Sequence, residues 1–279
     1  MQKILSLLIL CSVGFIAWLP LANIGGDDGL LTVRFLDVGQ GDAIHIITPD
    51  GYEMLIDGGA SALVLRELAK GRSFFDHDID IVVATHPDTD HVGGLVDVLK
   101  RYDVGFIIES VVLHEALAAN AFSVAADAEK AVRVTAQAGQ TLMLGDSTSV
   151  KILSPAGDTT NWQSNNASVI VKVVYGDTSF MLTGDASASI EDYLVSELGT
   201  ALQSNVLKLG HHGSKTSTSD LFLQFVQPQY AVVSAGVDNR YGHPHPSVIE
   251  RTEQYANIVS TAEQGTIVFK SDGREVWIE

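Results

Sequence analysis

A short run of metal-ligating side chains constrains this chain more than any other feature of its sequence. Residues 85–94 read Thr-His-Pro-Asp-Thr-Asp-His-Val-Gly-Gly and directly follow the apolar run of residues 79–84. Four potential ligands therefore fall within six positions: His86, Asp88, Asp90 and His91. A strand that ends in such a loop is typical of a metal site, because imidazole and carboxylate groups suit zinc, manganese or iron. Ligands so close in sequence do not all reach one tetrahedral ion, so the spacing indicates an open site or a two-metal site, and metal-assisted hydrolysis needs an open coordination position.

For any single histidine at a strand end, the alternative is a structural role at the surface or in the core. Four candidate ligands within one turn favour metal binding over that alternative. The two glycines at the end of the run allow a tight turn into a helix predicted over residues 92–100, whose N-terminus lies over the cluster.

Around this loop the sequence alternates short apolar runs with helical segments. Strands are predicted over residues 31–36, 43–48, 53–56, 79–84, 105–109, 141–144, 150–153, 169–175, 179–183, 205–209, 230–234, 266–270 and 275–278. Helices are predicted over residues 61–70, 92–100, 114–128, 186–197, 220–225 and 247–256. In each half, hairpins precede strand–helix units, and the strands at 141–144 and 150–153 are expected to close the first half at a sheet edge. This order predicts an α/β fold, an αββα four-layer sandwich of two mixed sheets flanked by helices.

The N-terminal segment differs from the remainder in composition. Residues 4–24 hold no charged side chain and follow a start that carries Lys3, so they predict a secretory signal peptide or a membrane anchor, with a buried core helix as the weaker alternative. We therefore assign residues 1–26 to a signal peptide or anchor and residues 27–279 to one domain. The expected location is outside the cytoplasm: secreted, periplasmic or anchored at the membrane.

Charge and cysteine content exclude several kinds of chemistry. The chain has 34 acidic and 17 basic residues, a formal charge of −17, which repels polyanions and argues against a broad nucleic-acid-binding surface. Its single cysteine, Cys11, lies in the apolar N-terminal segment, so the remainder has no thiol for a disulfide, a zinc site or a nucleophile. Metal chemistry therefore depends on histidines and carboxylates.

Two further clusters follow predicted strands, at the edge where such a sandwich brings its loops together. Residues 182–185, Leu-Thr-Gly-Asp, end on Asp185, whose two oxygens could bridge two cations and whose simpler role is to cap a helix. Residues 208–217 hold two consecutive histidines and then a Gly-Ser-Lys-Thr turn, rich in donors for phosphate oxygens. One of those histidines could orient a ligand instead of binding the metal.

A third cluster, residues 239–247, reads Asn-Arg-Tyr-Gly-His-Pro-His-Pro-Ser. Its imidazoles, His243 and His245, and the guanidinium of Arg240 could supply a proton donor and an anion clamp. The alternative is a rigid proline turn whose histidines only cap the next helix.

Together these motifs resemble those of the metallo-β-lactamase-fold hydrolases. In chain order they are Leu-Asp-Val-Gly-Gln-Gly-Asp-Ala (36–43), Asp-Gly-Gly (57–59), the His-Pro-Asp-Thr-Asp-His run (86–91), Thr-Gly-Asp (183–185), His-His-Gly-Ser (211–214) and Gly-His-Pro-His-Pro (242–246). The resemblance is strongest to the soluble domain of the ComEC family of competence DNA-uptake proteins, and it covers residues 31–279. The membrane spans of that family are missing, so the chain resembles a stand-alone exported relative, with residues 27–279 as a metallo-β-lactamase-like hydrolase domain.

The resemblance implies one or two divalent metal ions, zinc or manganese. It makes His86 and Asp88 ligands of one metal. Asp90 and His91 would bind the other, and Asp185 would bridge the two. Asp88 stands where the wider superfamily has a histidine.

The last ligand is implied to be one histidine of the pair His211 and His212, with His211 preferred because it lies nearest the strand end. The superfamily's usual histidine shortly before Asp185 is missing, and Asn166 is expected there against the metal or a water. Asp37 and Asp57 are expected to order loops or to support ligands.

The implied reaction is attack by a metal-bound hydroxide on a phosphoryl or acyl centre, with Asp90 orienting the nucleophile and His243 or His245 protonating the leaving group. The groups expected to hold the anion are Ser214, Lys215 and Arg240. A phosphodiester is the leading substrate, either a small molecule or single-stranded DNA; DNA would need a local basic strip, formed by Lys208, Lys215 and Arg240.

Two enzymatic alternatives are hydrolysis of a small phosphoester of the phosphocholine type and hydrolysis of a lactone or β-lactam. A reading from another class is a non-catalytic, metal-stabilised binding protein at the cell surface. The sequence indicates no protein partner.

Overall fold

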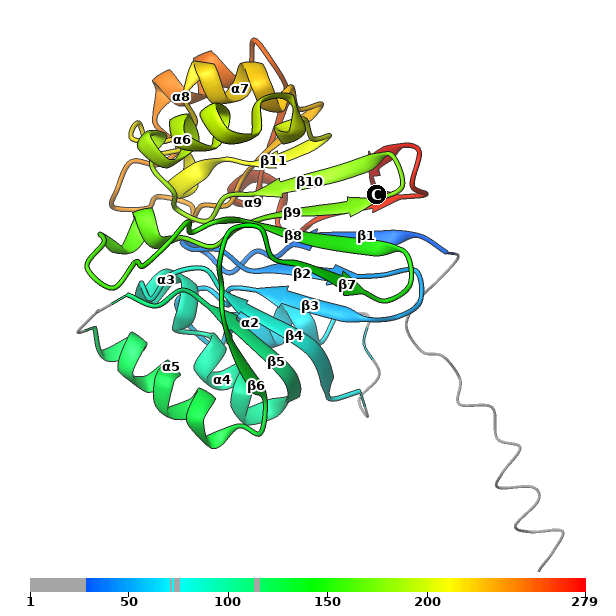
Figure 1. Ribbon diagram of the computed structural model, residues 1–279, viewed down its shortest axis with the longest axis vertical. Coiled ribbons are helices and arrows are strands. Elements are labelled where there is room, and N and C mark those ends of the chain that lie inside the picture. Colours follow the sequence, from blue (N-terminus) through cyan, green and yellow to red (C-terminus); the bar gives the residue numbers. More distant parts are fainter. Residues whose placement is uncertain (1–28, 71, 73–75, 113–115) are drawn as a thin grey trace, which may run out of the picture.

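The computed structural model describes residues 29–70, 72, 76–112 and 116–279. Two β-sheets pack face to face and helices cover the outer face of each, which gives four layers in the order αββα (Figure 1). The predicted fold class is therefore confirmed. The signal peptide or anchor predicted in residues 1–26 lies outside the described residues. Within the described ranges, no helix has both the length and the apolar character that a bilayer crossing requires.

The first sheet has eight strands and becomes parallel in its second half. Its order is β15 (Val276–Ile278), β14 (Ile267–Ser271), β1 (Leu31–Phe35), β2 (Ile44–Ile47), β3 (Glu53–Ile56), β4 (Asp78–Ala84), β5 (Asp103–Glu109) and β6 (Val132–Thr135). Strands β3 to β6 pair in parallel. Its outer layer consists of α2 (Leu63–Leu68), α3 (Thr89–Val92), α4 (Leu95–Arg101) and α5 (Leu117–Ala128) (Figure 1).

The second sheet has seven strands and is parallel from β10 to β13. Its order is β13 (Asn257–Ser260), β12 (Tyr230–Val233), β11 (Val206–Lys208), β10 (Thr178–Leu182), β9 (Ile170–Tyr175), β8 (Thr148–Ser154) and β7 (Thr141–Leu144). The helices α6 (Ala188–Leu198), α7 (Asp220–Val226) and α8 (Pro246–Thr252) cover it, and α9 (Thr261–Gln264) follows β13. Short 3₁₀ turns are η1 (Ser164–Ala167), η2 (Gly199–Leu202) and η3 (Gly210–Gly213).

The main core lies between the two sheets, where alternate residues of each strand meet. Phe269 of β14 packs edge-on against Phe35 of β1 and Phe180 of β10, with ring centroids 5.8 and 6.1 Å apart. All three side chains are fully buried. Each contributes about 1.5–3 kcal/mol through removal of apolar surface from water. This contact ties the first strand, the last hairpin and the second sheet together.

Several predicted elements have a different place in the fold. Strands β7 and β8, expected to close the first half, belong to the second sheet, where β8 pairs with β9 and β7 with β8. The last hairpin joins the first sheet beside β1. Strands β6 and β13 are absent from the sequence prediction. In β6 three of four side chains are exposed, so no apolar alternation marks it. The helix predicted over residues 92–100 corresponds to α4, which begins only at Leu95. A separate short helix, α3, ends at Val92, and Gly93 and Gly94 lie between the two.

Candidate metal centre

The loops that follow β4, β10 and β11 meet at one edge of the sandwich and bring the predicted ligands together. These ligands are His86, Asp88, Asp90, His91, Asp185, His211 and His212. The first four lie in the loop after β4 and in α3, the fifth directly after β10, and the last two in η3 after β11. Because parallel strands end at the same edge, residues distant in sequence become neighbours here.

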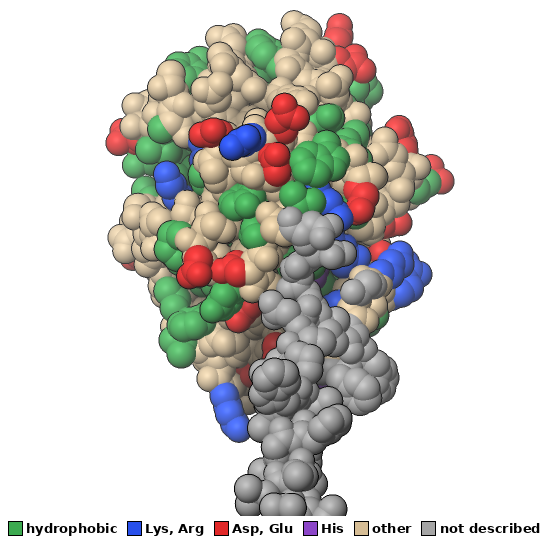
Figure 2. All heavy atoms as spheres, turned by 90° about the vertical axis from the view of Figure 1, so that its right-hand side faces the viewer, with side chains coloured by type: hydrophobic (Ala, Val, Ile, Leu, Met, Phe, Trp, Pro, Cys, Tyr) green, Lys and Arg blue, Asp and Glu red, His purple; other side chains and the backbone are tan. Residues whose placement is uncertain are grey.

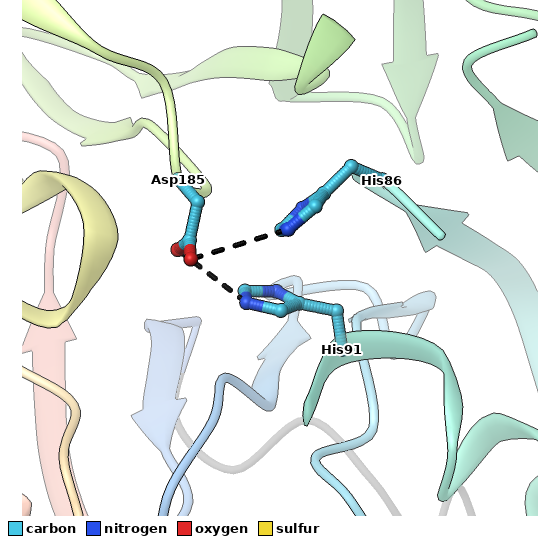
Figure 3. A group of neighbouring side chains, drawn as sticks. All are labelled: His86, His91 and Asp185. Carbon is cyan, nitrogen blue, oxygen red and sulfur yellow. Dashed lines mark ion pairs between the residues drawn. The ribbon is translucent and has the colours of Figure 1, made fainter. Parts of the chain in front are cut away.

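Asp185 lies at the centre of the cluster, and three buried imidazoles and the partly exposed one of His211 face it. His91 Nε2 is 3.4 Å from Asp185 Oδ1, and His86 Nε2 is 3.9 Å from Asp185 Oδ2 (Figure 3). His212 Nε2 lies 3.4 Å from Asp185 Oδ2 and 3.5 Å from Asp90 Oδ2. The ligand atoms of His86, His91 and Asp185 all lie within 4.8 Å of one another, as do those of Asp90, His91 and His212. These separations are those of groups that could share one or two cations.

The other nitrogen of each imidazole fixes its tautomer. His212 Nδ1 donates to the Ser234 carbonyl at 2.8 Å, and His91 Nδ1 donates to Asp57 at 2.7 Å. The Thr85 hydroxyl gives its proton to Asp57 at 2.6 Å, so at 3.0 Å it accepts from His86 Nδ1. Each Nε2 is therefore left with a lone pair for a metal, an arrangement typical of supported metal-binding histidines.

The inward atoms are left without conventional partners. Among the described residues, the buried Nε2 atoms of His86, His91 and His212 and Oδ1 of Asp185 have no hydrogen-bond partner. Buried polar atoms are rarely unpaired, because the loss of water contacts is not repaid. A divalent cation would satisfy the three Nε2 atoms, while Asp185 Oδ1 also lies 3.5 Å from Lys208 Nζ, so the residues present fit a metal.

The pKa values of His91, His212 and Asp185 show how strongly these buried groups depend on one another's charge. Burial would lower the pKa of His91 and of His212, but Asp185 beside both holds each pKa well above its ordinary value. Burial would raise the pKa of Asp185, yet the neighbouring His212, His91 and Lys208 hold it well below the ordinary value. Without a metal the imidazoles of His91 and His212 therefore take up protons, and metal binding is expected to release them.

The positions of the two consecutive histidines do not support the preference for His211 as the metal ligand. His212 is buried against Asp185 and Asp90, whereas the His211 side chain is 28% exposed and its Nε2 lies 3.7 Å from Asp185 Oδ2. Both residues have positive φ, 49° and 56°, so the chain reverses and turns the second imidazole inward. This geometry favours His212 over His211 as the ligand.

The loop before β9 contacts the centre through residues other than the predicted one. Ser164 Oγ donates to Asp88 at 2.5 Å, and Asn165 Nδ2 lies 3.3 Å from His211 Nδ1. Asn166 instead accepts from Ser187 at 2.6 Å. The loop therefore packs over the centre, but Asn166 has a partner in the second half of the fold.

Of the three residues predicted to hold the anionic substrate, two are accessible to solvent and one is buried. Lys215 and Arg240 are exposed, and Arg240 donates to the Tyr241 hydroxyl at 2.7 Å. Ser214 is buried, and its hydroxyl lies 3.0 Å from that of Thr216.

The two histidines of the third cluster have separate surroundings. The His243 ring lies 5.4 Å from the His211 ring, and burial, with His211 next, lowers its pKa. His245 Nδ1 accepts the Ser247 backbone N–H at 3.2 Å and caps α8. This arrangement matches the capping alternative for His245.

Lys208 and Asp42 also lie at the centre, although neither was predicted as a ligand. The position of Lys208 contradicts its predicted place in a basic surface strip. Lys208 is fully buried, so it is not part of a surface strip, and its Nζ lies 2.5 Å from Asp42 Oδ2. Asp42 could have been suspected from its place after Gly39-Gln-Gly41. At Gly41, with φ +123°, a Cβ would lie 2.1 Å from the Asp90 carbonyl oxygen, so only glycine brings Asp42 this close to the metal loop.

Replacing Asp57 by asparagine is expected to weaken metal binding by about 10–100-fold, because the amide cannot accept from His91 Nδ1, Thr85 Oγ1 and the Thr85 backbone N–H together. The measurement is a competition titration of the metal-free protein against a chromophoric chelator. The matched control is Asp37→Asn, because among the described residues the Asp37 side chain accepts only a local bond, from the Gly39 backbone N–H. Equal affinities for wild type and Asp57→Asn would contradict a supporting role.

Comparison with known proteins agrees with this geometry. The sequence matches the profile of the Metallo-beta-lactamase superfamily over residues 36–237. It is 30% identical to ComE operon protein 3 of Bacillus subtilis over 95% of this chain and 36% of that protein. It is 33% identical to Recombination protein 2 of Haemophilus influenzae over 84% of this chain and 28% of that protein. The chain thus spans about a third of the length of these curated relatives.

Solved structures show the same fold at low sequence identity. The metallo-beta-lactamase fold protein YhfI from Bacillus subtilis has a TM-score of 0.56 at 12% identity, covering 86% of this chain and 99% of that one. CmlA, a diiron beta-hydroxylase from Streptomyces venezuelae, has a TM-score of 0.52 at 13% identity, covering 86% and 54%. The profile match, the αββα layers and the histidine–aspartate cluster at the sheet edge lead to one assignment: this chain belongs to the metallo-β-lactamase superfamily and has ComEC-like relatives.

Proposed function

We propose that this protein is an exported, metal-dependent hydrolase that cleaves phosphodiester bonds. One observation carries the proposal: three imidazoles with fixed tautomers present unpaired Nε2 atoms to the Asp185 carboxylate within the described fold. A divalent ion bound there supplies a Lewis acid and lowers the pKa of a water to about 7. The similarity to a relative named for recombination supports a phosphodiester.

The chain's own residues take distinct roles in this reaction. Asp90 is 27% exposed against 4% for Asp185, so its carboxylate is able to orient a water from the open side. We assign proton transfer to the leaving group to His243, because His245 is committed to the α8 cap. Lys215 and Arg240 remain to hold the anionic substrate, and Ser214 shapes the turn between them and the centre.

The surface favours a small or short substrate over long DNA. Burial of Lys208 leaves two exposed basic groups, Lys215 and Arg240, from the predicted strip. Figure 2 shows the right-hand end of Figure 1, opposite α3 and the metal loop, where Lys and Arg side chains are also mixed with acidic and uncharged ones. The protein's net charge of −17 repels a polyanion, so two exposed basic groups give long DNA little gain in affinity. We therefore rank small phosphodiesters and short single strands first.

The test combines metal analysis with hydrolysis of bis(p-nitrophenyl) phosphate and single-stranded DNA. We expect a chelator to lower both rates at least about 100-fold, and manganese or zinc to restore them. Asp90→Ala is expected to lose turnover, whereas the matched control Asp177→Ala, in the exposed β9–β10 turn, should keep it. Chelator-insensitive cleavage would contradict the mechanism. Absence of bound metal and of turnover would favour the non-catalytic binding protein instead.

We further propose that residues 4–24 direct export or anchor the domain at the membrane. The uncharged apolar stretch after Lys3 supports this assignment. Fractionation of cells that make the full chain would distinguish an anchored from a released domain.

A further inference from the structure

Lys208 is a buried ammonium in the middle of a carboxylate cluster. It ends β11, a strand whose three residues are all buried, and its side chain is fully inaccessible. Its Nζ lies 2.5 Å from Asp42 Oδ2, donates to the Gly184 carbonyl at 2.8 Å, and lies 3.5 Å from Asp185 Oδ1. Three oxygens thus surround one positive charge, as oxygen ligands surround a hard cation.

The oxygens that Lys208 contacts belong to groups that otherwise have the arrangement of metal ligands. Asp42 lies within 4.8 Å of Asp185 and His212, and also within 4.8 Å of Asp57 and His91, measured between ligand atoms. All of these side chains are buried. A buried carboxylate is tolerated only when it is paired, and Asp42 comes from the first sheet whereas Lys208 comes from the second. The pair therefore also joins the two halves of the centre.

We propose that the Lys208 ammonium is a tethered cation that fills one of the cation positions of this cluster, so that Asp42 and Asp185 Oδ1 are held without a further metal ion. The opposite oxygen of Asp185, Oδ2, then faces the imidazoles of His86, His211 and His212 at 3.9, 3.7 and 3.4 Å. Lys208 is thus a positioning residue for Asp185. This role extends beyond the proposed hydrolysis, because the ion pair forms in the protein itself and its test needs no turnover.

The experiment measures thermal unfolding of the full-length, metal-free protein. Lys208→Ala, which removes the charge and leaves space, is expected to lower Tm by about 10 °C, because a buried carboxylate loses its partner. Added ethylammonium should recover at least half of that loss, whereas propanol, a neutral molecule of similar size, should not. Wild type and Lys208→Met should gain nothing from ethylammonium, because their side chains fill the space.

The outcomes that would overturn the proposal are definite. Lys208→Met with the Tm of wild type would show that no cation is needed at this position. A destabilised Lys208→Ala that gains no more from ethylammonium than from propanol would show that packing, not charge, is what Lys208 supplies. Lys100→Ala is the matched control, because that exposed lysine lies 3.3 Å from Asp97 and should change Tm by only about 1–2 °C.

A second variant covers the case in which Lys208→Ala does not fold. Asp42→Asn combined with Lys208→Met removes the cation together with its nearest carboxylate. We expect this double variant to unfold several degrees above Lys208→Met alone, since no carboxylate at that position remains unpaired. Equal Tm values for the two variants would contradict the pairing of Lys208 with Asp42. Neither comparison depends on hydrolysis, so failure here is distinguishable from failure of the proposed function.

Discussion

Asp185→Asn is expected to remove tight metal binding and to lower metal-dependent hydrolysis by about 1,000-fold or more. The Asp185 oxygens lie 3.4 Å from Nε2 of His91, on one side, and 3.4 Å from Nε2 of His212, on the other. Loss of a group that only supports a ligand costs about 10–100-fold in affinity, so loss of the charge at the centre of the cluster is expected to cost more. Asparagine keeps the shape of the side chain and removes its charge.

Two measurements check this expectation. Metal content after dialysis reports binding, and hydrolysis of bis(p-nitrophenyl) phosphate at saturating manganese reports turnover. Asp177→Asn is the matched control, because that side chain is exposed in the β9–β10 turn. Circular dichroism of both variants establishes that the fold is kept. Wild-type metal content in Asp185→Asn would show that the cluster does not bind metal through this residue.

Gly94→Ala is expected to destabilise the domain by about 4 kcal/mol or more, the range of exceptional single substitutions. A Cβ at Gly94 would lie 2.0 Å from the Gly58 carbonyl oxygen and 2.5 Å from that of Ser61. Both neighbours are backbone, and backbone bonds hold them in place: Gly94 N–H donates to the Gly59 carbonyl, and Gly58 N–H donates to that of His91. The helix that carries His91 must therefore move away from the first sheet.

Urea unfolding measures this loss as a change in the free energy of unfolding. The control is Gly139→Ala, where a Cβ meets open space and the only cost is a φ of +91°, about 1 kcal/mol. Equal losses at Gly94 and Gly139 would show that the close approach of the two backbones does not restrain the metal loop. A large loss at Gly94 alone would explain why the ligand run ends in two glycines.

The strand positions and the metal loop could be predicted because their signals are local. The apolar run of β4 ends where the ligands begin, and His86, Asp88, Asp90 and His91 lie in one continuous segment. The identity of the side chains then limits the chemistry to metal ions that accept nitrogen and oxygen ligands. Sheet membership was less accessible, because β7 and β8 have the same pattern whichever sheet they join.

The supporting residues depend on long-range contacts. Asp57 was expected to order a loop or to support a ligand, and the structure gives it bonds to His91 and Thr85. The Lys208 pair with Asp42 joins the end of β11 to the loop between β1 and β2 of the other sheet, and apolar periodicity gives no sign of this contact. Lys208 was predicted to be exposed because a lysine at a strand end usually is. It is buried here because the carboxylates of Asp42 and Asp185 pair with its charge.

By itself the sequence determined the fold class, the loop that holds the ligands and the donor types at the centre, since these depend on apolar periodicity and on residues close along the chain. Only the tertiary structure decided which imidazoles face inward. His211 and His212 are adjacent and chemically identical, and two residues of positive φ turn the second toward Asp185. The direction of the backbone and the packing of the two sheets determine which histidine faces Asp185, and the local pattern of side chains predicts neither.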